Sequence, residues 1–127
     1  MARRLVECVP NFSEGRNAEV VSQIAAAALS VAGVVLLDQQ IDPDHNRSVL
    51  TLLGEPEVVL EAVIRATGEA AKLIDLNKHQ GVHPRIGATD VVPFIPVENV
   101  TMDECALLAE KAGQAIWDRF EIGRAHV

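Results

Sequence analysis

The stretch that decides the fold runs from residue 34 to residue 54 and reads VVLLDQQIDPDHNRSVLTLLG. It contains two short apolar segments, Val34–Leu37 and Val49–Leu53, on either side of the turn-forming residues Asp42–Asn46. Two strands joined by so short a connection pair in antiparallel fashion, because a parallel pair needs a crossover of about a dozen residues or more. The stretch therefore favours an antiparallel sheet over a doubly wound parallel one.

The flanking sequence adds helices on both sides of this strand pair. Asn17 is a typical N-cap residue, Pro56 suits the first turn of a helix, and Thr101-x-x-Glu104 is a capping box. The expected strands cover residues 5–9, 34–37, 49–53 and 91–97, and the expected helices cover residues 17–32, 55–76 and a stretch from Thr101 onward. This order predicts an α+β fold: a ferredoxin-like βαββαβ antiparallel sheet with its helices on one face, plus an extra C-terminal helix.

The composition is that of a soluble globular protein. The chain has 127 residues with 49% hydrophobic and 23% charged residues, which fits one domain or part of one and excludes a disordered chain. The first residues contain no apolar segment of signal-peptide length before Glu7, and no apolar run is long enough for a membrane span. Cys8 and Cys105 lie far apart and imply no disulfide framework. We therefore expect a cytoplasmic protein.

Charge is distributed unevenly along the chain. The formal net charge of −7 argues against a partner that is nucleic acid or an anionic membrane. Residues 77–87, by contrast, contain no acidic side chain. They include the basic residues Lys78 and Arg85 and the histidines His79 and His83. A single basic segment in an acidic protein suggests a local site for a small anionic ligand.

His83 is the strongest candidate for chemistry in this segment. Pro84 biases it toward an extended conformation, and a histidine in a loop between glycines is presented to solvent. Imidazole can accept and return a proton near neutral pH. Two alternatives stay open on the residues alone. One is a surface histidine without a function, and the other is a zinc site with His79, which Pro84 and the lack of a CxxC motif disfavour.

Two arginines, Arg47 and Arg85, lie in segments rich in glycine, proline and asparagine. The planar guanidinium group matches a carboxylate in shape and charge. Solvated surface arginines would give the same pattern, so carboxylate recognition is a hypothesis at this point.

Four motifs in the same order resemble the glutamate formiminotransferase family. They are VECVPNFSEG (residues 6–15), HNRSV (45–49), HQGVHPRIGATD (79–90) and VPFIPV (92–97). The resemblance covers roughly residues 5 to 120. The chain departs from the family at Gln39-Gln40-Ile41, where many relatives carry an acidic residue, and no role is assigned there.

The resemblance implies a transferase that moves the formimino group of N-formimino-L-glutamate to N5 of tetrahydrofolate, in histidine breakdown and one-carbon metabolism. It implies that His83, in the HPR motif, is the catalytic residue. It also implies that Arg47, Arg85 and Lys78 bind the carboxylates of the substrates. The complete set of expected substrate-binding residues is Asn11, Asn46, Arg47, Lys78, His79 and Arg85. No metal and no bound cofactor are implied, because tetrahydrofolate is a co-substrate.

The resemblance further implies that residues 1–121 form the first of two similar α/β subdomains, with the substrates bound in the groove between them. The folate-binding segment then lies in the missing second subdomain, so we expect the fragment alone to be inactive and the full-length parent to be a homodimer. An apolar face should be left exposed on the last helix, around Leu108, Ile116, Trp117 and Phe120, and the fragment should self-associate.

Residues 122–127, IGRAHV, match the in-frame translation of a common sequencing adapter. We interpret them as a non-native read-through tail and give Arg124 and His126 no role.

Two other functions fit the same sequence. The first is a non-catalytic small-molecule-binding module with the ferredoxin-like fold, since a fold does not determine a function. Such a module does not require a histidine after the second helix. The second is a related folate-dependent formyl transferase, which the sequence does not distinguish from a formimino transferase.

Overall fold

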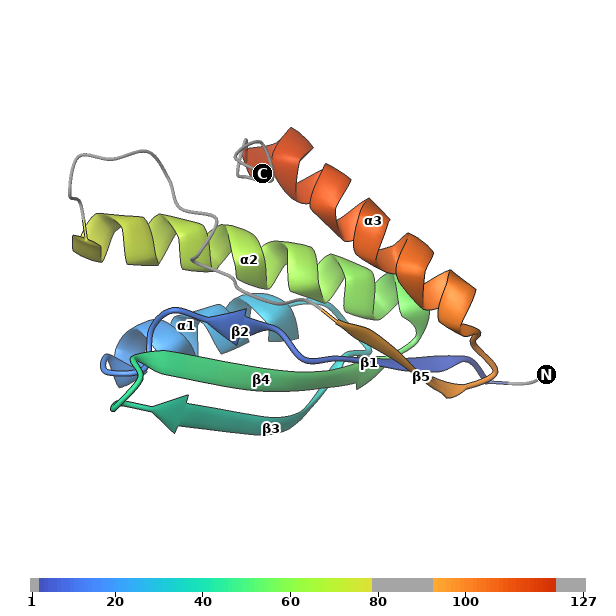
Figure 1. Ribbon diagram of the computed structural model, residues 1–127, viewed down its shortest axis with the longest axis horizontal. Coiled ribbons are helices and arrows are strands. Elements are labelled where there is room, and N and C mark those ends of the chain that lie inside the picture. The colour runs from blue at the N-terminus through green and yellow to red at the C-terminus, as the bar shows by residue number, and fades with distance from the viewer. Residues whose placement is uncertain (1–2, 79–92, 121–127) are drawn as a thin grey trace.

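The computed structural model describes residues 3–78 and 93–120, apart from the side chains of residues 75–78 and 120 (Figure 1). The elements are β1 (Leu5–Cys8), β2 (Asn11–Phe12), α1 (Ala18–Leu29), β3 (Val35–Asp42), β4 (Arg47–Gly54), α2 (Pro56–Lys78), β5 (Phe94–Glu98) and α3 (Met102–Phe120). Within the described residues no helix has both the length and the apolar character needed to cross a membrane.

The sheet is organised around β4. This strand pairs with β3 along one side, and with β2 and then β1 along the other, while β5 pairs with the outer side of β1. All of these pairs are antiparallel. The sheet and the helix order confirm the predicted α+β ferredoxin-like architecture, including its extra C-terminal helix.

The short strand β2 is not among the expected strands, the first of which covers residues 5–9. The interruption between β1 and β2 is small, and the N–H of Leu50 donates to the carbonyl of Pro10 across it, at 3.2 Å. Asn11 then pairs with Val49 and Phe12 with Ser48. Proline cannot donate to a sheet ladder, but β4 reaches past it and continues the pairing.

The two faces of the sheet differ sharply. One row crosses β3, β4, β1 and β5 and points toward the helices; it consists of Leu36, Leu52, Cys8 and Phe94. Leu52 and Cys8 are completely buried there. The adjacent row Val35, Leu53, Glu7 and Ile95 lies on the opposite face, because side chains alternate along a strand. We call this opposite side, which faces away from the helices, the open face.

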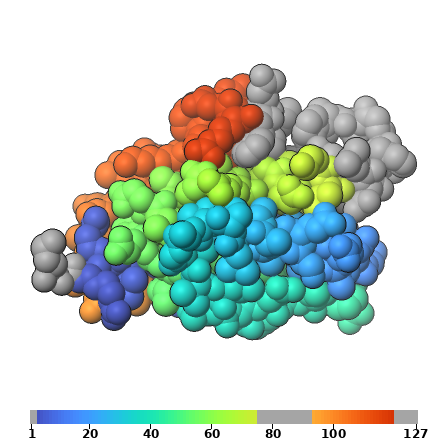
Figure 2. Space-filling model, turned by 180° about the vertical axis from the view of Figure 1, so that it is seen from behind, coloured from blue at the N-terminus to red at the C-terminus, as the bar shows by residue number. Residues whose placement is uncertain are grey.

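The helices form a single layer on one face of the sheet, as predicted (Figure 1). Seen from behind, α2 lies between α1 and α3 (Figure 2). α2 ends at Lys78, two residues beyond the expected end at residue 76. Asn17 caps α1 with its Oδ1, which accepts from the N–H groups of Glu19 (3.0 Å) and Val20 (3.3 Å).

The predicted capping box of α3 is also confirmed. The N–H of Glu104 donates to the Thr101 hydroxyl (3.1 Å), and the N–H of Thr101 donates to the Glu104 carboxylate (2.9 Å). The backbone hydrogen bond from Thr101 is the main reason that the pKa of Glu104 is lowered.

The predicted exposure of an apolar face on α3 was wrong for two of its residues. Leu108 and Ile116 are buried, at 6% and 9% exposure, because α3 packs these side chains against the rest of the core. Trp117 is 37% exposed, and the side chain of Phe120 lies outside the described residues. The exposed apolar side chains on the sheet are instead Val35, Leu37, Ile41, Ile95 and Val97.

An ion-pair network joins the three helices. The carboxylate of Glu61 on α2 accepts two hydrogen bonds from Arg119 on α3 (2.8 and 2.9 Å) and one from Arg65 (2.9 Å). Arg65 also donates to the Ser30 hydroxyl at the end of α1 (3.0 Å). Arg119 first, and then Arg65, lower the pKa of Glu61 from its ordinary 4.5 to about 2.

Replacing this carboxylate tests what the network contributes. The pKa of Glu61 is lower in the folded state, so its stabilisation is present above about pH 4.5 and is lost as the pH falls toward 2. We expect Glu61→Gln to lower the free energy of unfolding by about 1 to 2 kcal/mol at pH 7, since both arginines are half exposed and solvent weakens their ion pairs. Urea denaturation should show the difference shrinking between pH 5 and 2. Glu110→Gln, on an exposed part of α3, is the control. If the loss of unfolding free energy in Glu61→Gln does not change with pH, the ion pairs of Glu61 contribute nothing to stability.

Candidate active site

The structure describes part of the expected site. Asn11, Asn46 and Arg47 have described side chains, and Lys78 is described only as the last residue of α2. His79, His83 and Arg85 lie outside the described residues. Their roles, including that of His83 as catalytic residue, stay predictions.

The ends of the segment that carries these residues are both placed. It leaves the last turn of α2 and rejoins the sheet at Pro93, whose carbonyl accepts from the N–H of Val9 at 3.3 Å. The end of α2 lies at the same end of the molecule as the turn between β3 and β4 and the start of α1 (Figure 1). The end of α2 at Lys78 therefore lies at the same end of the molecule as Asn46 and Arg47, which belong to the turn between β3 and β4 and to the start of β4.

Asn11 and Arg47 occupy the open face at this end. Asn11 pairs with Val49, two residues along β4 from Arg47. Residues two apart on a strand share a face, and the residues of β4 that alternate with these are buried against the helices. Gln40 also pairs with Val49, which puts the position of the departure from the family on the other side of β4 from Asn11.

Two loops are bonded to each other beside Arg47. The N–H of Gly15, in the loop after β2, donates to the Oδ1 of Asn46 at 2.9 Å. Arg16 donates from Nε to the carbonyl of Pro43 at 2.9 Å. We call residues 13–17 the first loop and residues 43–46 the second loop. Sequence reasoning placed both loops among the motifs but gave no sign that they contact each other.

The approach of the loops requires glycine. A Cβ atom at Gly15 would collide with the backbone nitrogen and oxygen of Arg47 and would come within 2.6 Å of the carbonyl of Asp42. Asn46 has a φ of 52°, in the left-handed region that asparagine tolerates better than most residues. Close packing therefore requires glycine in one motif, and a positive φ favours asparagine in the other.

A buried carboxylate completes the first loop. Glu14 is only 7% exposed, and its Oε2 accepts from the N–H groups of Arg16 (3.2 Å) and Asn17 (3.0 Å). These N–H groups precede the first turn of α1, where a negative charge is favourable. Glu14 was missed by the sequence reasoning. The signal that could have found it is an acidic residue three positions before a helix N-cap.

His45 in the second loop forms an exposed pair with Asp42, the last residue of β3. The carboxylate of Asp42 contacts the Nδ1 of His45 at 2.7 Å and accepts from the N–H groups of Asp44 (3.1 Å) and His45 (3.3 Å). The hydrogen bond to the His45 ring is the main cause that lowers the pKa of Asp42. Among the described residues no three His, Cys, Asp or Glu side chains gather as metal ligands would.

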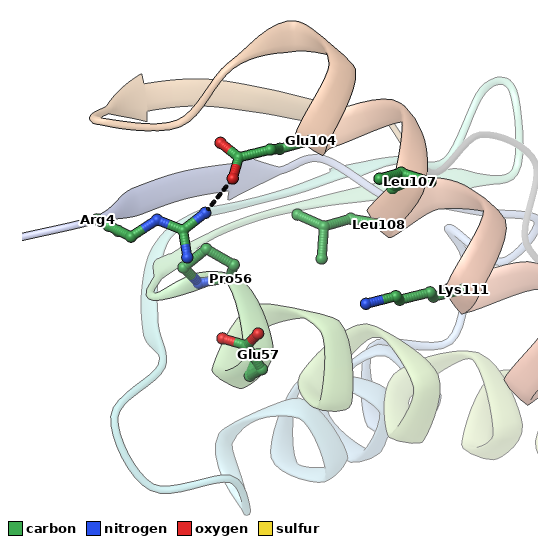
Figure 3. Close-up of a pocket in the computed structure, with 7 residues that line it drawn as sticks. All are labelled: Arg4, Pro56, Glu57, Glu104, Leu107, Leu108 and Lys111. Carbon is green, nitrogen blue, oxygen red and sulfur yellow. Dashed lines mark hydrogen bonds and ion pairs between the residues drawn. The ribbon is translucent and has the colours of Figure 1, made fainter.

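A small pocket lies at the other end of the molecule, where α2 and α3 begin (Figure 3). Its volume of about 180 Å³ is below the 300 Å³ or so of a typical small-ligand pocket. An ion pair between Arg4 and Glu104 (2.7 Å) crosses its rim. None of the predicted site residues lines it, so we do not assign the substrates to this pocket.

Comparison with known proteins agrees with the four motifs. The chain matches the model of the formiminotransferase domain, N-terminal subdomain, over residues 5–125. It is 50% identical over 119 residues to formimidoyltransferase-cyclodeaminase of Rattus norvegicus, covering 94% of this chain and 22% of that protein.

Microbial proteins match at a somewhat lower identity. Glutamate formimidoyltransferase of Streptococcus pyogenes serotype M1 is 45% identical over 113 residues, with 89% of this chain and 38% of that protein covered. The protein of the same name from Thermoplasma acidophilum is 43% identical over 118 residues, which is 93% of this chain and 39% of that protein. The chain therefore spans well under half the length of these relatives. It belongs to the formiminotransferase family and carries the N-terminal subdomain of the formiminotransferase domain.

Proposed function

We propose that this chain supplies one wall of the active site of a glutamate formimidoyltransferase. The observation that carries the proposal is the family match over residues 5–125, together with the position of Asn11 and Arg47 on one face and at one end of the sheet. The substrates are N-formimino-L-glutamate and tetrahydrofolate, and the folate is a co-substrate. No metal or bound cofactor takes part in the proposed reaction.

The reaction needs a group that takes up a proton and gives it back. N5 of tetrahydrofolate attacks the formimino carbon and forms a new C–N bond, and N5 loses its proton as the tetrahedral intermediate forms. The intermediate collapses with cleavage of the bond to the glutamate nitrogen, which must gain a proton. A single imidazole can accept the first proton and donate it in the second step. We assign this role to His83.

The carboxylates of the two substrates need cationic partners. Arg47 lies on the open face, Lys78 is the last residue of α2, and Arg85 belongs to the segment that follows this helix. Arginine binds carboxylates through two parallel hydrogen bonds, which also fixes their orientation. Asn11 lies beside Arg47 on the same face and can bind neutral groups of the substrate. His79 is the remaining candidate for substrate binding.

The second subdomain of the domain is proposed to cover the open face. Val35, Leu37, Ile95 and Val97 are each 41–50% exposed on the outer strands of the sheet. Apolar side chains gathered on one surface often mark a contact with another part of the protein. The substrates then lie between the two subdomains, and the full-length protein is proposed to be a cytoplasmic homodimer.

The role of His83 is tested in a full-length protein that carries this chain as its N-terminal subdomain. His83→Ala should lower kcat by about two to four orders of magnitude, the usual effect of losing a general acid–base. His79→Ala in the same segment is the control. Equal losses from both substitutions would indicate a metal pair or a collapsed segment, and nearly normal turnover without His83 would end its assignment.

The same assay separates the two substrate classes. Supplying tetrahydrofolate with formiminoglutamate or with formylglutamate identifies the donor. A faster reaction with formylglutamate would favour the formyl transferase, whereas folate binding without any turnover would favour a non-catalytic module.

The open face is tested on the isolated chain. We expect it to self-associate through this face, and Ile95→Glu should weaken the association about tenfold or more, since burying an unpaired charge costs at least about 1.4 kcal/mol. Leu107→Glu is the matched control, because Leu107 is 55% exposed but lies on α3. Sedimentation equilibrium measures both variants. A larger effect at Leu107 would move the interface to α3.

A further inference from the structure

Arg47 stands at a point where three segments meet. It is the first residue of β4, and its backbone pairs with Asp42 at the end of β3. Gly15 in the first loop lies so close to the backbone of both Arg47 and Asp42 that no side chain fits between them. The backbone of Arg47 is therefore held by Asp42 and by Gly15, so the two loops fix the point from which its side chain starts.

Asn46 connects these loops through its side chain. Its Oδ1 accepts the hydrogen bond from Gly15, while its own backbone adopts the left-handed conformation that precedes Arg47. The same residue thus sets the backbone direction immediately before Arg47 and bonds the loop that packs against it. One lone pair of the Oδ1 is thus used inside the protein, and the hydrogen bond from Gly15 fixes the orientation of the amide group.

We infer that Asn46 is a positioning residue that acts through Arg47. In this role it does not bind the substrate itself, although the sequence placed it among the substrate-binding residues. It fixes the start of β4 so that the guanidinium of Arg47 is preorganised for a carboxylate of the substrate, which reduces the entropy lost on binding. The inference rests on the proposed function of Arg47 and goes beyond it by naming what holds that arginine.

Asn99 offers a matched control for the local structure. It is the other non-glycine residue with a positive φ among the described residues, at 55°, and its Nδ2 donates to the carbonyl of Arg3 at 2.7 Å. It therefore combines the same backbone conformation with a side-chain hydrogen bond between two segments. It lies at the opposite end of the sheet from Arg47, between β5 and α3.

The test is a double-mutant cycle in a full-length protein that carries this chain, with formiminoglutamate as the varied substrate. Arg47→Ala should raise KM about ten- to a hundredfold, as expected for a hydrogen bond to a charged group. Asn46→Ala should raise KM about three- to tenfold with little change in kcat. The double variant should have a KM less than about twofold above that of Arg47→Ala alone. A residue that acts through Arg47 has no effect once Arg47 is gone.

Two further variants separate positioning from general stability. Asn46→Asp keeps an acceptor oxygen and tolerates the positive φ, so it should restore KM to near the original value. Asn99→Ala should lower the melting temperature about as much as Asn46→Ala does but leave KM unchanged. This pattern would support the inference.

Three outcomes would overturn it. Full additivity of Asn46→Ala and Arg47→Ala would show that Asn46 contacts the substrate independently. An Asn46→Ala variant with lower stability and unchanged KM would show a purely structural role, like that of Asn99. If Arg47→Ala leaves KM unchanged, both the inference and the proposed binding role of Arg47 fail, whereas additivity refutes the inference and leaves the proposed function intact.

Discussion

The alternation of side chains along β4 is the constraint on which the rest of the structure depends. This strand pairs with β1, β2 and β3, so its register sets the face of every residue opposite it. Ser48, Leu50 and Leu52 point into the core, and the residues between them point away. A shift of one residue would exchange the two sets and expose the core. The aliphatic core and the position of Arg47 on the open face are consequences of the same register.

The helix layer follows from small side chains along α2. Ala62, Ala66 and Ala70 are completely buried on this helix, and such residues allow α1 and α3 to pack close to it. With only 3% aromatic residues, the core depends on many well-fitted aliphatic contacts rather than on a few large ones. The polar surface of the same helices is joined by Glu61 and its two arginines. Apolar packing and one charged cluster therefore hold the three helices together from different sides.

Local patterns in the sequence were sufficient for most of the fold. The short connection before β4 and the caps at Asn17 and Thr101 act over a few residues, so both the antiparallel sheet and the starts of the helices could be predicted. Long-range contacts could not. Which side chains of α3 are buried depends on how closely α2 approaches it. The hydrogen bond between Gly15 and Asn46 joins residues 31 positions apart. For the site, sequence motifs identified which residues to consider, and the fold brought Asn11 and Arg47 to one face.

The open face is divided along its length. The row of Val35, Leu53, Glu7 and Ile95, in which all but Glu7 are apolar, crosses the sheet at Leu53. Asn11 and Gln40 flank Val49, and Arg47 lies beyond. Val49 and Leu53 are four residues apart, which is about 13 Å along a strand. A second subdomain that packs on the apolar end would hold the two parts together while leaving the polar end as the wall of a cleft. Under the proposed function, this division explains how one face can both bind a partner and receive two charged substrates. Burial of apolar area at one end stabilises the contact, and the exposed Arg47 at the other end lies where a substrate carboxylate can reach it.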